Sequence, residues 1–248
     1  MSKIVLDICF DGRNFNGTQS QKEGNAVQDV LSSALKSVFN LDSKITMCSR
    51  LDAGVSAHSF FLSFSGSEVL AKKAKYALNR FLPLQIRVKS TYLAPDSFNP
   101  RFDEIEKTYV YRIRFNEYNP IFDAFNYAEK WADPNKYMEA VKLIKDAKDI
   151  SLFCSLEKNS LPPKGINNIE VIKENDLVST FITSKAFGRY EVRYIVGAGL
   201  MVGRGKISKE ELLDIVNGKQ KNHIRYKAPS SGLSLLEVKY PPNLLMPC

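Results

Sequence analysis

Residues 50–64 read RLDAGVSAHSFFLSF and join a turn of small residues to a strand pattern. Asp52 stands in the turn, and the alternating apolar residues that follow indicate a half-buried strand. We therefore expect Arg50 and Asp52 to lie on a loop that leads into this strand. Loops held by rigid elements often carry catalytic groups. An Asp beside Gly more commonly caps a turn, however, and taken alone the stretch favours that structural role.

Elements on both sides of this stretch predict a β-α-β-α-β unit. Ile4, Leu6, Ile8 and Phe10 alternate as a strand. A first helix is expected to begin at Asn25 as its N-cap, since apolar residues then recur at helical spacing. After the Asp52 loop and its strand, Ser67 is expected to cap a second helix that runs to about Arg80. Residues 86–93 complete the unit as a strand, in a split ferredoxin-like arrangement.

The second half of the chain has a similar composition of strands and helices. Pro95 to Pro100 interrupts the pattern, so we place a boundary between an N-terminal domain, 1–97, and a C-terminal domain, 98–248. Strands are expected at 107–115, 178–182 and 233–240. Helices are expected from Asp133-Pro134 to about Ala147 and from the capping box at Ser208 to near Gly218. The fold class is therefore α+β, with antiparallel sheets flanked by helices in two ferredoxin-like (RRM-like) domains.

Composition narrows the classes of protein that are compatible with the sequence. The chain has 248 residues, of which 44% are apolar, so both halves can form cores. Its four cysteines are widely spaced and its only histidines are His58 and His223, which argues against a zinc site or a disulfide framework. General acid-base chemistry would have to use carboxylate, tyrosine, lysine or water. We see neither a signal peptide nor a membrane span, and we expect a cytoplasmic protein.

The charge favours a nucleic acid as the partner. Thirty-five Lys and Arg residues against 27 Asp and Glu give a net charge of +8. Such an excess attracts polyanions through counterion release. The cations gather in four clusters with tyrosines between them: Lys72, Lys73, Lys75 and Arg80; Lys107, Arg112 and Arg114; Arg189, Arg193, Arg204 and Lys206; Lys219, Lys221, Arg225 and Lys227. Each cluster alone is the usual pattern of a solvated face.

An arginine beside an apolar stripe marks the segment 187–197, FGRYEVRYIVG. Val192, Ile195, Val196 and Leu200 recur at helical spacing, and Arg193 lies next to them. Burying a guanidinium is costly without an anion, so Arg193 implies a carboxylate or phosphate partner. The alternative is that its head reaches water while its stem packs on the stripe.

Five blocks of the sequence, in order, resemble the TruA family of tRNA pseudouridine synthases, and together they span nearly the whole chain. The blocks are Phe10-Asp11-Gly12 with Phe15, Gly17 and Gln19; Arg50 to Val55, similar to R-T-D-A-G-V; Phe98 to Phe102 with Lys107 to Tyr111; Ala186-Phe187 with Val192-Arg193 and Val196-Gly197; and Ala228-Pro229 with Gly232-Leu233, similar to A-P-x-x-G-L. Five matches in register carry more weight than any single motif.

Four residues depart from the family pattern: Thr18 replaces Trp, Leu51 replaces Thr, Ser56 replaces His, and Glu191 stands where Met or Gln is usual. None of these departures removes the Asp, Tyr or Arg that the chemistry uses. The lost Trp and His would lie near the RNA, so the departures bear on the choice of substrate. They leave open an alternative, a catalytically impaired or retargeted RNA-binding paralogue. A small-molecule α+β hydrolase is a further reading, which the basic clusters oppose.

The resemblance implies an isomerisation of uridine to pseudouridine on the 3′ side of the tRNA anticodon stem-loop, without cofactor or metal. It implies Asp52 as the essential carboxylate, Arg193 as its ion-pair partner and Tyr109 as the aromatic that stacks on the flipped base, in a cleft between the two domains. Leu233 would close the apolar wall of the pocket. Further contacts with the RNA are expected from Arg50, Asp11 and Gln19. The resemblance also implies a homodimer in which one tRNA contacts both subunits.

Overall fold

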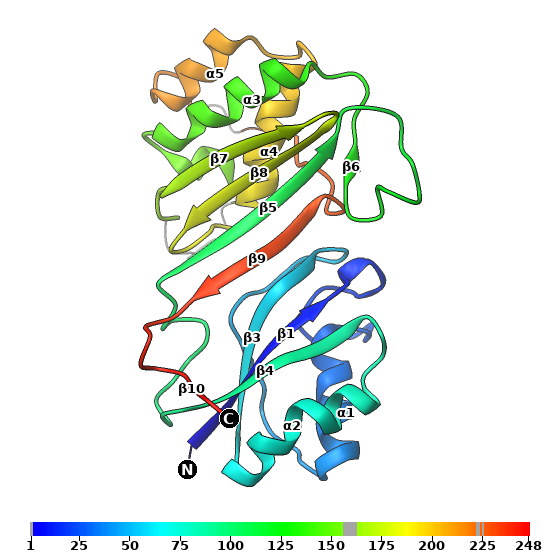
Figure 1. Ribbon diagram of the computed structural model, residues 1–248. Coiled ribbons are helices and arrows are strands. Elements are labelled where there is room, and N and C mark those ends of the chain that lie inside the picture. Colours follow the sequence, from blue (N-terminus) through cyan, green and yellow to red (C-terminus); the bar gives the residue numbers. More distant parts are fainter. Residues whose placement is uncertain (1, 156–162, 222–223, 225) are drawn as a thin grey trace. The chain divides into compact units, whose positions relative to one another are not determined.

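The computed structural model describes residues 2–155, 163–221, 224 and 226–248, so His223 and Arg225 lie outside the described residues. The protein is a mixed α+β structure in which mostly antiparallel strands are flanked by helices (Figure 1). The predicted α+β class is confirmed, whereas the arrangement as two ferredoxin-like domains stays a prediction. In the part of the chain described here, no helix is long and apolar enough to cross a membrane.

The chain divides into two compact units. The first consists of Met1–Glu106 together with Ser234–Cys248, and the second of Lys107–Leu233. These limits differ from the expected boundary at residue 97, because the C-terminal segment returns to the first unit and supplies strands to its sheet. The assignment of 1–97 and 98–248 as separate domains stays a prediction.

The first unit is built on an antiparallel core of three strands. β1 (Ser2–Phe10) lies between β3 (Ser56–Gly66) and β4 (Ile86–Ala94) and pairs antiparallel with both. The returning segment adds β9 (Leu233–Lys239), parallel to β3, and β10 (Met246–Pro247), antiparallel to β4. The short β2 (Thr46–Met47) pairs with β3. β1 is buried on both faces, since Ile4, Val5 and Leu6 are fully covered.

Two helices complete the first unit, and the sequence placed one start correctly and one wrongly. α2 (Glu68–Phe81) begins after Ser67, whose side chain accepts a hydrogen bond from the Leu70 N–H, as predicted. α1 (Val27–Phe39) has Ala26 as its N-cap, so the choice of Asn25 was wrong by one residue. Asn25 adopts a left-handed conformation and donates its amide to the Asn14 carbonyl, and the Asp29 carboxylate accepts the Ala26 N–H instead.

The second unit has a sheet in the order β5-β8-β7. β5 (Glu106–Arg114) pairs antiparallel with β8 (Leu177–Ser184), and β8 pairs antiparallel with β7 (Asn168–Glu174). The short β6 (Tyr127–Ala128) runs parallel to the end of β5. β5 was predicted from its alternation, and β8 was predicted as a shorter strand over residues 178–182. β7 was not, because most of its side chains are exposed and its pattern carries little apolar signal.

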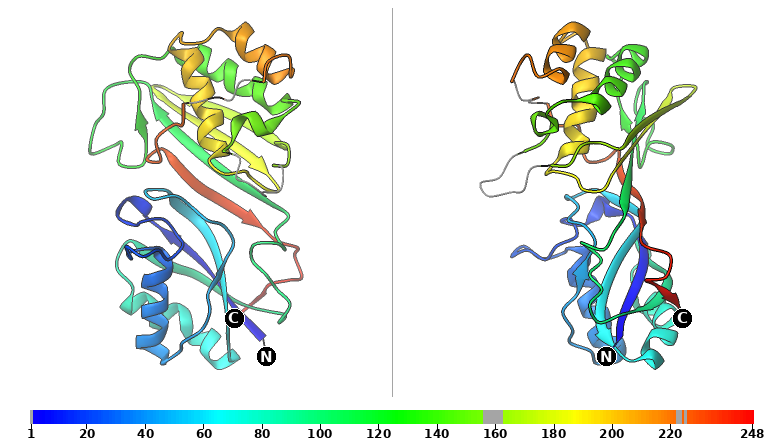
Figure 2. Two further views of the ribbon diagram at one scale, coloured as in Figure 1. Left: turned by 180° about the vertical axis from the view of Figure 1, so that it is seen from behind. Right: turned by 90° about the vertical axis from the view of Figure 1, so that its left-hand side faces the viewer.

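The helices of the second unit pack against one another and cover one face of this sheet (Figures 1 and 2). α3 (Pro134–Leu143) follows the Asp133 N-cap, as predicted, and continues as a 3-10 turn over Ile144–Asp146. A second 3-10 turn covers Ile150–Phe153. α4 (Glu191–Gly203) carries the predicted apolar stripe, and α5 (Lys209–Val216) follows the predicted capping box at Ser208.

The contact between α3 and α4 depends on a glycine. A Cβ at Gly199 would lie 2.3 Å from Val141 Cγ2 and 2.8 Å from Tyr137 Cδ2. Tyr137 cannot easily move, because it is fully buried and its hydroxyl forms a 2.7 Å hydrogen bond with Thr180. Gly199 therefore permits the close approach of the two helices.

We predict that Gly199→Ala lowers the free energy of unfolding by about 1–2 kcal/mol, because the 2.3 Å contact places the overpacking cost in the upper part of its range. Overpacking a core costs typically about 1–3 kcal/mol, and alanine recovers about 1 kcal/mol of helix propensity over glycine. Urea unfolding of both variants measures the change. Gly165→Ala is the control, since no atom lies within 4 Å of the added Cβ. An unchanged or higher urea midpoint for Gly199→Ala would contradict this account of the packing.

Candidate active site

Asp52 lies on a tight turn that leads directly into β3, as the sequence predicted. The Val55 N–H donates to the Asp52 carbonyl at 3.2 Å, and Gly54 within the turn has φ +82°. Leu51 and Val55 on either side are buried, whereas Asp52 is half-buried. The two buried neighbours anchor the turn, so the carboxylate is held at the surface of a rigid element.

Two glycines of the first sequence block pack closely against the backbone of this turn. A Cβ at Gly12 would lie 1.9 Å from the Val55 carbonyl oxygen, and one at Gly17 would lie 2.6 Å from the Leu51 carbonyl oxygen. Gly17 also has φ +80°, a conformation that residues with a side chain rarely adopt. Only glycine allows the backbone at residues 12 and 17 to approach the Asp52 turn so closely. The glycines of the first block therefore help to set the position of Asp52.

Thr18 and Ser56, which depart from the family pattern, hydrogen-bond within this assembly. The buried Thr18 hydroxyl accepts the Leu51 N–H at 2.9 Å, and the Thr18 N–H donates to the Leu51 carbonyl at 3.1 Å. The Ser56 hydroxyl accepts the Gly12 N–H at 3.0 Å. Both side chains therefore tie the first block to the Asp52 turn.

The other predicted RNA contacts of the first unit differ in their surroundings. Arg50 and Gln19 are exposed. The Asp11 carboxylate accepts bidentate hydrogen bonds from the Arg13 guanidinium, the shortest at 2.7 Å. These bonds from Arg13 hold the pKa of the Asp11 carboxyl below its usual value. Asp11 thus orients Arg13, and this partner was not foreseen from the sequence.

In the second unit, Tyr109 lies on β5 with its ring buried. The ring meets Phe187 edge-to-face, with centroids 4.9 Å apart and planes at 84°. Such edge-to-face pairs fix the plane of a ring. Phe187 belongs to the same sequence block as Arg193, so this pair joins two of the blocks on which the resemblance depends.

Arg193 is clamped by the segment 228–233. Its Nε donates to the Ala228 carbonyl at 2.7 Å, and the Ala228 N–H donates back to the Arg193 carbonyl at 3.0 Å. The same segment is bound to β5, because the Tyr111 hydroxyl donates to the Pro229 carbonyl at 2.8 Å and the Arg112 N–H donates to the Gly232 carbonyl at 2.9 Å. Leu233, at its end, is buried. The segment that carries Leu233 is therefore bonded to both the Arg193 helix and the Tyr109 strand.

Three cations surround the ring of Tyr190, the residue before α4. Lys227 Nζ lies 3.8 Å from the ring centroid, and the guanidinium carbons of Arg189 and Arg193 lie at 4.8 and 5.6 Å. Tyr190 adopts φ +60°, which is strained for a bulky residue. The aromatic face thus helps to orient Arg193 within a strongly positive region, as an anionic substrate would require.

Other members of the basic clusters have structural partners. Arg114 Nε lies 2.5 Å from the buried Asp123 carboxylate, and Arg204 pairs with the buried Glu129. Lys72 and Lys219 pair with Glu68 and Asp214. The clusters seen in the sequence therefore mix structural ion pairs with cations available to a ligand, a distinction that charge patterning alone does not make.

Glu191 is a buried carboxyl at the start of α4, two residues from Arg193. One carboxyl oxygen accepts the Gly188 N–H at 2.6 Å, and the other has no hydrogen-bond partner among the described residues. Burial raises the pKa of Glu191 to about 8, although the Gly188 hydrogen bond opposes this. At neutral pH the side chain is mostly uncharged and so resembles the glutamine that is usual at this position. It therefore does not compete as an anion for Arg193.

The predicted site residues fall in both units. Asp52, Arg50, Asp11 and Gln19 belong to the first, and Tyr109, Arg193 and Leu233 to the second. The first unit presents a half-buried carboxylate on a rigid turn. The second presents a fixed guanidinium, a fixed aromatic ring and an apolar residue on interlinked elements. A carboxylate of this kind can act as a nucleophile or a base, and the residues of the second unit can bind an anion and pack against a planar ring.

Comparisons with known proteins agree with the blocks seen in the sequence. A family model described as tRNA pseudouridine synthase matches residues 145–241. The chain is 32% identical to a tRNA pseudouridine synthase A 2 of Clostridium tetani over 96% of this chain and 98% of the relative. It is 30% identical to the protein of the same name from Bacillus anthracis, over 97% and 100%. It is also 31% identical to a tRNA pseudouridine synthase A of Syntrophomonas wolfei, over 97% and 98%.

We predict that Thr18→Val destabilises the protein by about 1–3 kcal/mol and reduces turnover. The substitution preserves the shape of the side chain but leaves the buried Leu51 N–H unpaired. The Asp52 turn then loses one of its two hydrogen bonds to Thr18. Urea unfolding and initial rates of substrate conversion measure the two effects.

Thr91→Val is the matched control for this prediction. Thr91 is also buried, but its hydroxyl has no hydrogen-bond partner among the described residues. Removing an unpaired buried hydroxyl should be neutral or stabilising. Equal effects of the two substitutions would show that the Thr18 hydroxyl does not support the turn.

We predict that Glu191→Gln removes a pH dependence of stability between pH 5 and 8. In this range the unfolded chain releases the Glu191 proton, whose ordinary pKa is 4.5, while the folded chain keeps it up to a pKa of about 8. The folded wild type therefore loses stability as pH rises, by up to about 1.4 kcal/mol per pH unit. Glutamine carries no such proton, so the variant should match the wild type at pH 5 and exceed its stability at pH 8.

Urea unfolding at pH 5, 6.5 and 8 measures the difference. Glu210→Gln is the control, because Glu210 lies in the first turn of α5 but is exposed. The account of Glu191 would be wrong if both variants and the wild type changed stability with pH in parallel.

Proposed function

Because the chain belongs to the TruA family of tRNA pseudouridine synthases, it is an isomerase that acts on tRNA uridine, and we propose that Asp52 is its essential carboxylate. We further propose that its targets are uridines on the 3′ side of the anticodon stem-loop. The observation that carries the proposal is the Asp52 turn, whose backbone rests on Gly12 and Gly17 at distances that only glycine permits. A turn fixed so closely suits a carboxylate that must meet one sugar carbon.

The reaction needs no cofactor. The N1–C1′ bond of the uridine breaks, the base turns over, and a C5–C1′ bond forms. The proton on C5 leaves and N1 ends protonated, so the atoms of substrate and product balance. Asp52 would begin this sequence at the ribose, either by attacking C1′ or by taking the C2′ proton. Both routes require the carboxylate to be ionised.

Residues of the second unit would supply the remaining functions. Arg193 would pair with Asp52 and keep it deprotonated and oriented, since a guanidinium beside a carboxylate favours the charged form. The hydrogen bond from its Nε to the Ala228 carbonyl supports this role, because it fixes the orientation of the guanidinium plane. Tyr109 would stack on the flipped base and pass the C5 proton towards solvent, and Leu233 would close the pocket.

Binding of the RNA would use the exposed and basic residues. Arg50, two positions from Asp52 and exposed, is suited to fill the space that the flipped base leaves. Gln19 and the Asp11–Arg13 pair would contact the RNA nearby. Arg189 and Lys227, beside the Tyr190 ring, would bind phosphates and set the position of the tRNA without reading its sequence. We propose that the enzyme works in the cytoplasm as a homodimer that binds one tRNA across both subunits.

We predict that Asp52→Asn abolishes tritium release from tRNA transcripts labelled at uridine C5, with a loss of at least about 10³-fold. The wild type should release one tritium for each uridine converted. Asp42→Asn, the same substitution at an exposed position, should leave the rate unchanged. Transcripts with cytidine in place of the uridines on the 3′ side of the anticodon stem-loop should release no tritium.

The remaining outcomes separate the alternatives. Tight tRNA binding by the wild type without any release would favour a catalytically impaired RNA-binding paralogue. Release from the cytidine-substituted transcripts would favour a retargeted enzyme that acts on another uridine. Full release by Asp52→Asn would refute Asp52 as the essential carboxylate.

A further inference from the structure

One face of α4 carries three residues that contact a segment much further along the chain. Arg193, Gly197 and the C-cap residue Arg204 are spaced by four and seven positions, so they follow one another along the same side of the helix. Arg193 Nε donates to the Ala228 carbonyl, whereas Gly197 and Arg204 both contact Tyr226. The chain from Tyr226 to Ala228 therefore follows this face of α4 back towards the start of the helix.

The backbone of Tyr226 packs directly on α4. A Cβ at Gly197 would lie 1.9 Å from the Tyr226 carbonyl oxygen and 3.4 Å from its Cδ1. Gly197 belongs to the same sequence block as Arg193. The glycine lets the carbonyl of Tyr226 approach the helix backbone closely. A steric contact of this kind sets the distance between two segments, but it does not prevent one from sliding along the other.

The side chain of Tyr226 is held by Arg204. Arg204 Nη2 donates to the Tyr226 hydroxyl at 3.2 Å, and the guanidinium carbon lies 4.7 Å from the centre of the Tyr226 ring. A guanidinium at this distance is attracted to the aromatic face. Because Arg204 lies two helical turns beyond Gly197, Tyr226 is attached to α4 at two points.

Arg204 is itself fixed by a buried carboxylate. Glu129, which follows β6, is 3% exposed and accepts hydrogen bonds from Arg204 Nη2 and, at 3.1 Å, from its Nε. Arg204 Nη2 also donates to the Tyr127 hydroxyl at 2.9 Å. Burial opposes ionisation, but the hydrogen bonds from Arg204 keep the pKa of the Glu129 carboxyl below its usual value. The cation that holds Tyr226 therefore has a fixed position.

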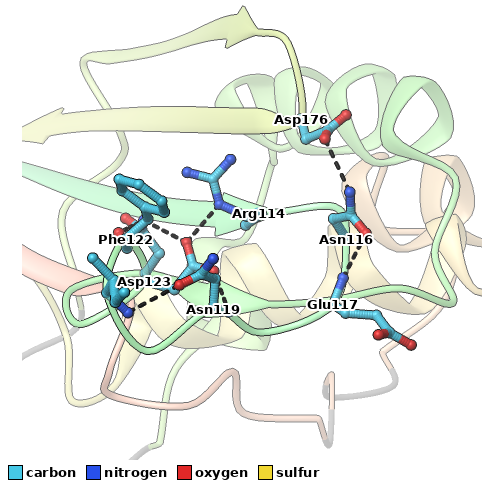
Figure 3. A network of polar contacts seen from close by, with 9 residues as sticks. Arg114, Asn116, Glu117, Asn119, Phe122, Asp123 and Asp176 are labelled. Atoms are coloured by element: carbon cyan, nitrogen blue, oxygen red, sulfur yellow. Dashed lines mark hydrogen bonds and ion pairs between the residues drawn. The ribbon is translucent and has the colours of Figure 1, made fainter.

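Another buried ion pair of this unit, between Arg114 and Asp123, fixes a loop to β5 (Figure 3). The Asp123 carboxylate also accepts the Asn119 N–H at 2.9 Å, so its bonds hold the loop to which it belongs. The pair formed by Arg204 differs, since its cation also binds Tyr226 in a segment distant in sequence. It can therefore position the residues that follow Tyr226 as well as stabilise the fold.

We infer that Tyr226, held by Arg204, is a positioning residue that acts through Ala228 on the Arg193 guanidinium. The inference rests on the proposed role of Arg193 as the partner of the essential carboxylate. Tyr226 fixes the chain just before Ala228, whose carbonyl accepts the Arg193 Nε–H at 2.7 Å. If that carbonyl moved, the guanidinium plane would turn, and small displacements of catalytic groups lower turnover steeply. Loss of Tyr226 should therefore lower kcat without weakening tRNA binding.

We predict that Tyr226→Ala lowers the single-turnover rate of tritium release from tRNA labelled at uridine C5 by at least about 10-fold. The tRNA dissociation constant, measured by filter binding, should stay within about threefold of the wild-type value, because the substitution acts on the chemical step. Tyr226→Phe keeps the ring that Arg204 contacts, so it should restore the rate to within about threefold of wild type.

Tyr137→Phe controls for a general loss of stability. Tyr137 is fully buried in the same unit, and its hydroxyl forms a 2.7 Å hydrogen bond with Thr180. This variant should lower the urea midpoint but keep the rate of tritium release. If Tyr226→Ala and Tyr137→Phe lost activity in proportion to the fall in their urea midpoints, the effect of Tyr226 would be structural and the inference would fail.

A double-mutant cycle tests whether Tyr226 acts through Arg193. Arg193→Lys keeps the charge but removes the Nε–H that the Ala228 carbonyl accepts, so the rate should fall. In that background Tyr226→Ala should cause no further loss, since the hydrogen bond it maintains is already absent. A further loss of about 10-fold in the double variant would show that the two residues act independently and would overturn the inference.

The remaining outcomes separate this inference from the proposed function. Weaker tRNA binding by Tyr226→Ala at an unchanged single-turnover rate would identify Tyr226 as an RNA contact and overturn its positioning role. An impaired Arg193→Lys beside a fully active Tyr226→Ala would overturn the inference alone. Full activity of Arg193→Lys would contradict the proposed role of the Arg193 guanidinium, and the inference would fail with it.

Discussion

The close approach of two backbone segments in the first unit is the constraint on which the account of the site depends. Gly12 and Gly17 lie so near the Asp52 turn that a single added carbon would meet the carbonyl oxygens of Val55 and Leu51. The Thr18 and Ser56 hydroxyls then fix the turn with hydrogen bonds. Because the turn leads directly into β3, the central strands of the unit hold the carboxylate in place. Two distant sequence blocks thus act as one structural element.

In the second unit, hydrogen bonds link the segments that carry the candidate residues. The segment 228–233 forms hydrogen bonds with Arg193 on α4 and with Tyr111 and Arg112 on β5. These bonds link the helix to the strand through an irregular segment that precedes β9. Burial keeps Glu191, at the start of α4, mostly uncharged at neutral pH. The hydrogen bonds give the guanidinium a fixed position. A fixed position is what a partner for an ionised carboxylate needs.

Local signals predicted most of the fold, and tertiary contacts explain what they missed. Ser67, Ser208 and Asp133-Pro134 begin helices because their caps act within a few residues. Asn25 was a reasonable cap by residue type, but its amide binds Asn14, a contact outside the reach of a local pattern. β7 was missed, although Asn175 and Asp176 between β7 and β8 are residues that favour turns, and Asn175 has φ +54°. The order of the blocks indicated the candidate residues, whereas the neutral state of Glu191 and the partner of Asp11 depend on burial and geometry.

The central claim is that Asp52 and Arg193 form an ion pair at the ribose of the flipped uridine. A crystal structure of the protein bound to a tRNA anticodon stem-loop would measure the distance between the Asp52 carboxylate and the Arg193 guanidinium. We expect an N···O distance below about 4 Å, with the Tyr109 ring stacked on the base. A complex in which the flipped uridine lies against other residues, with Asp52 and Arg193 well beyond ion-pair distance, would contradict the account.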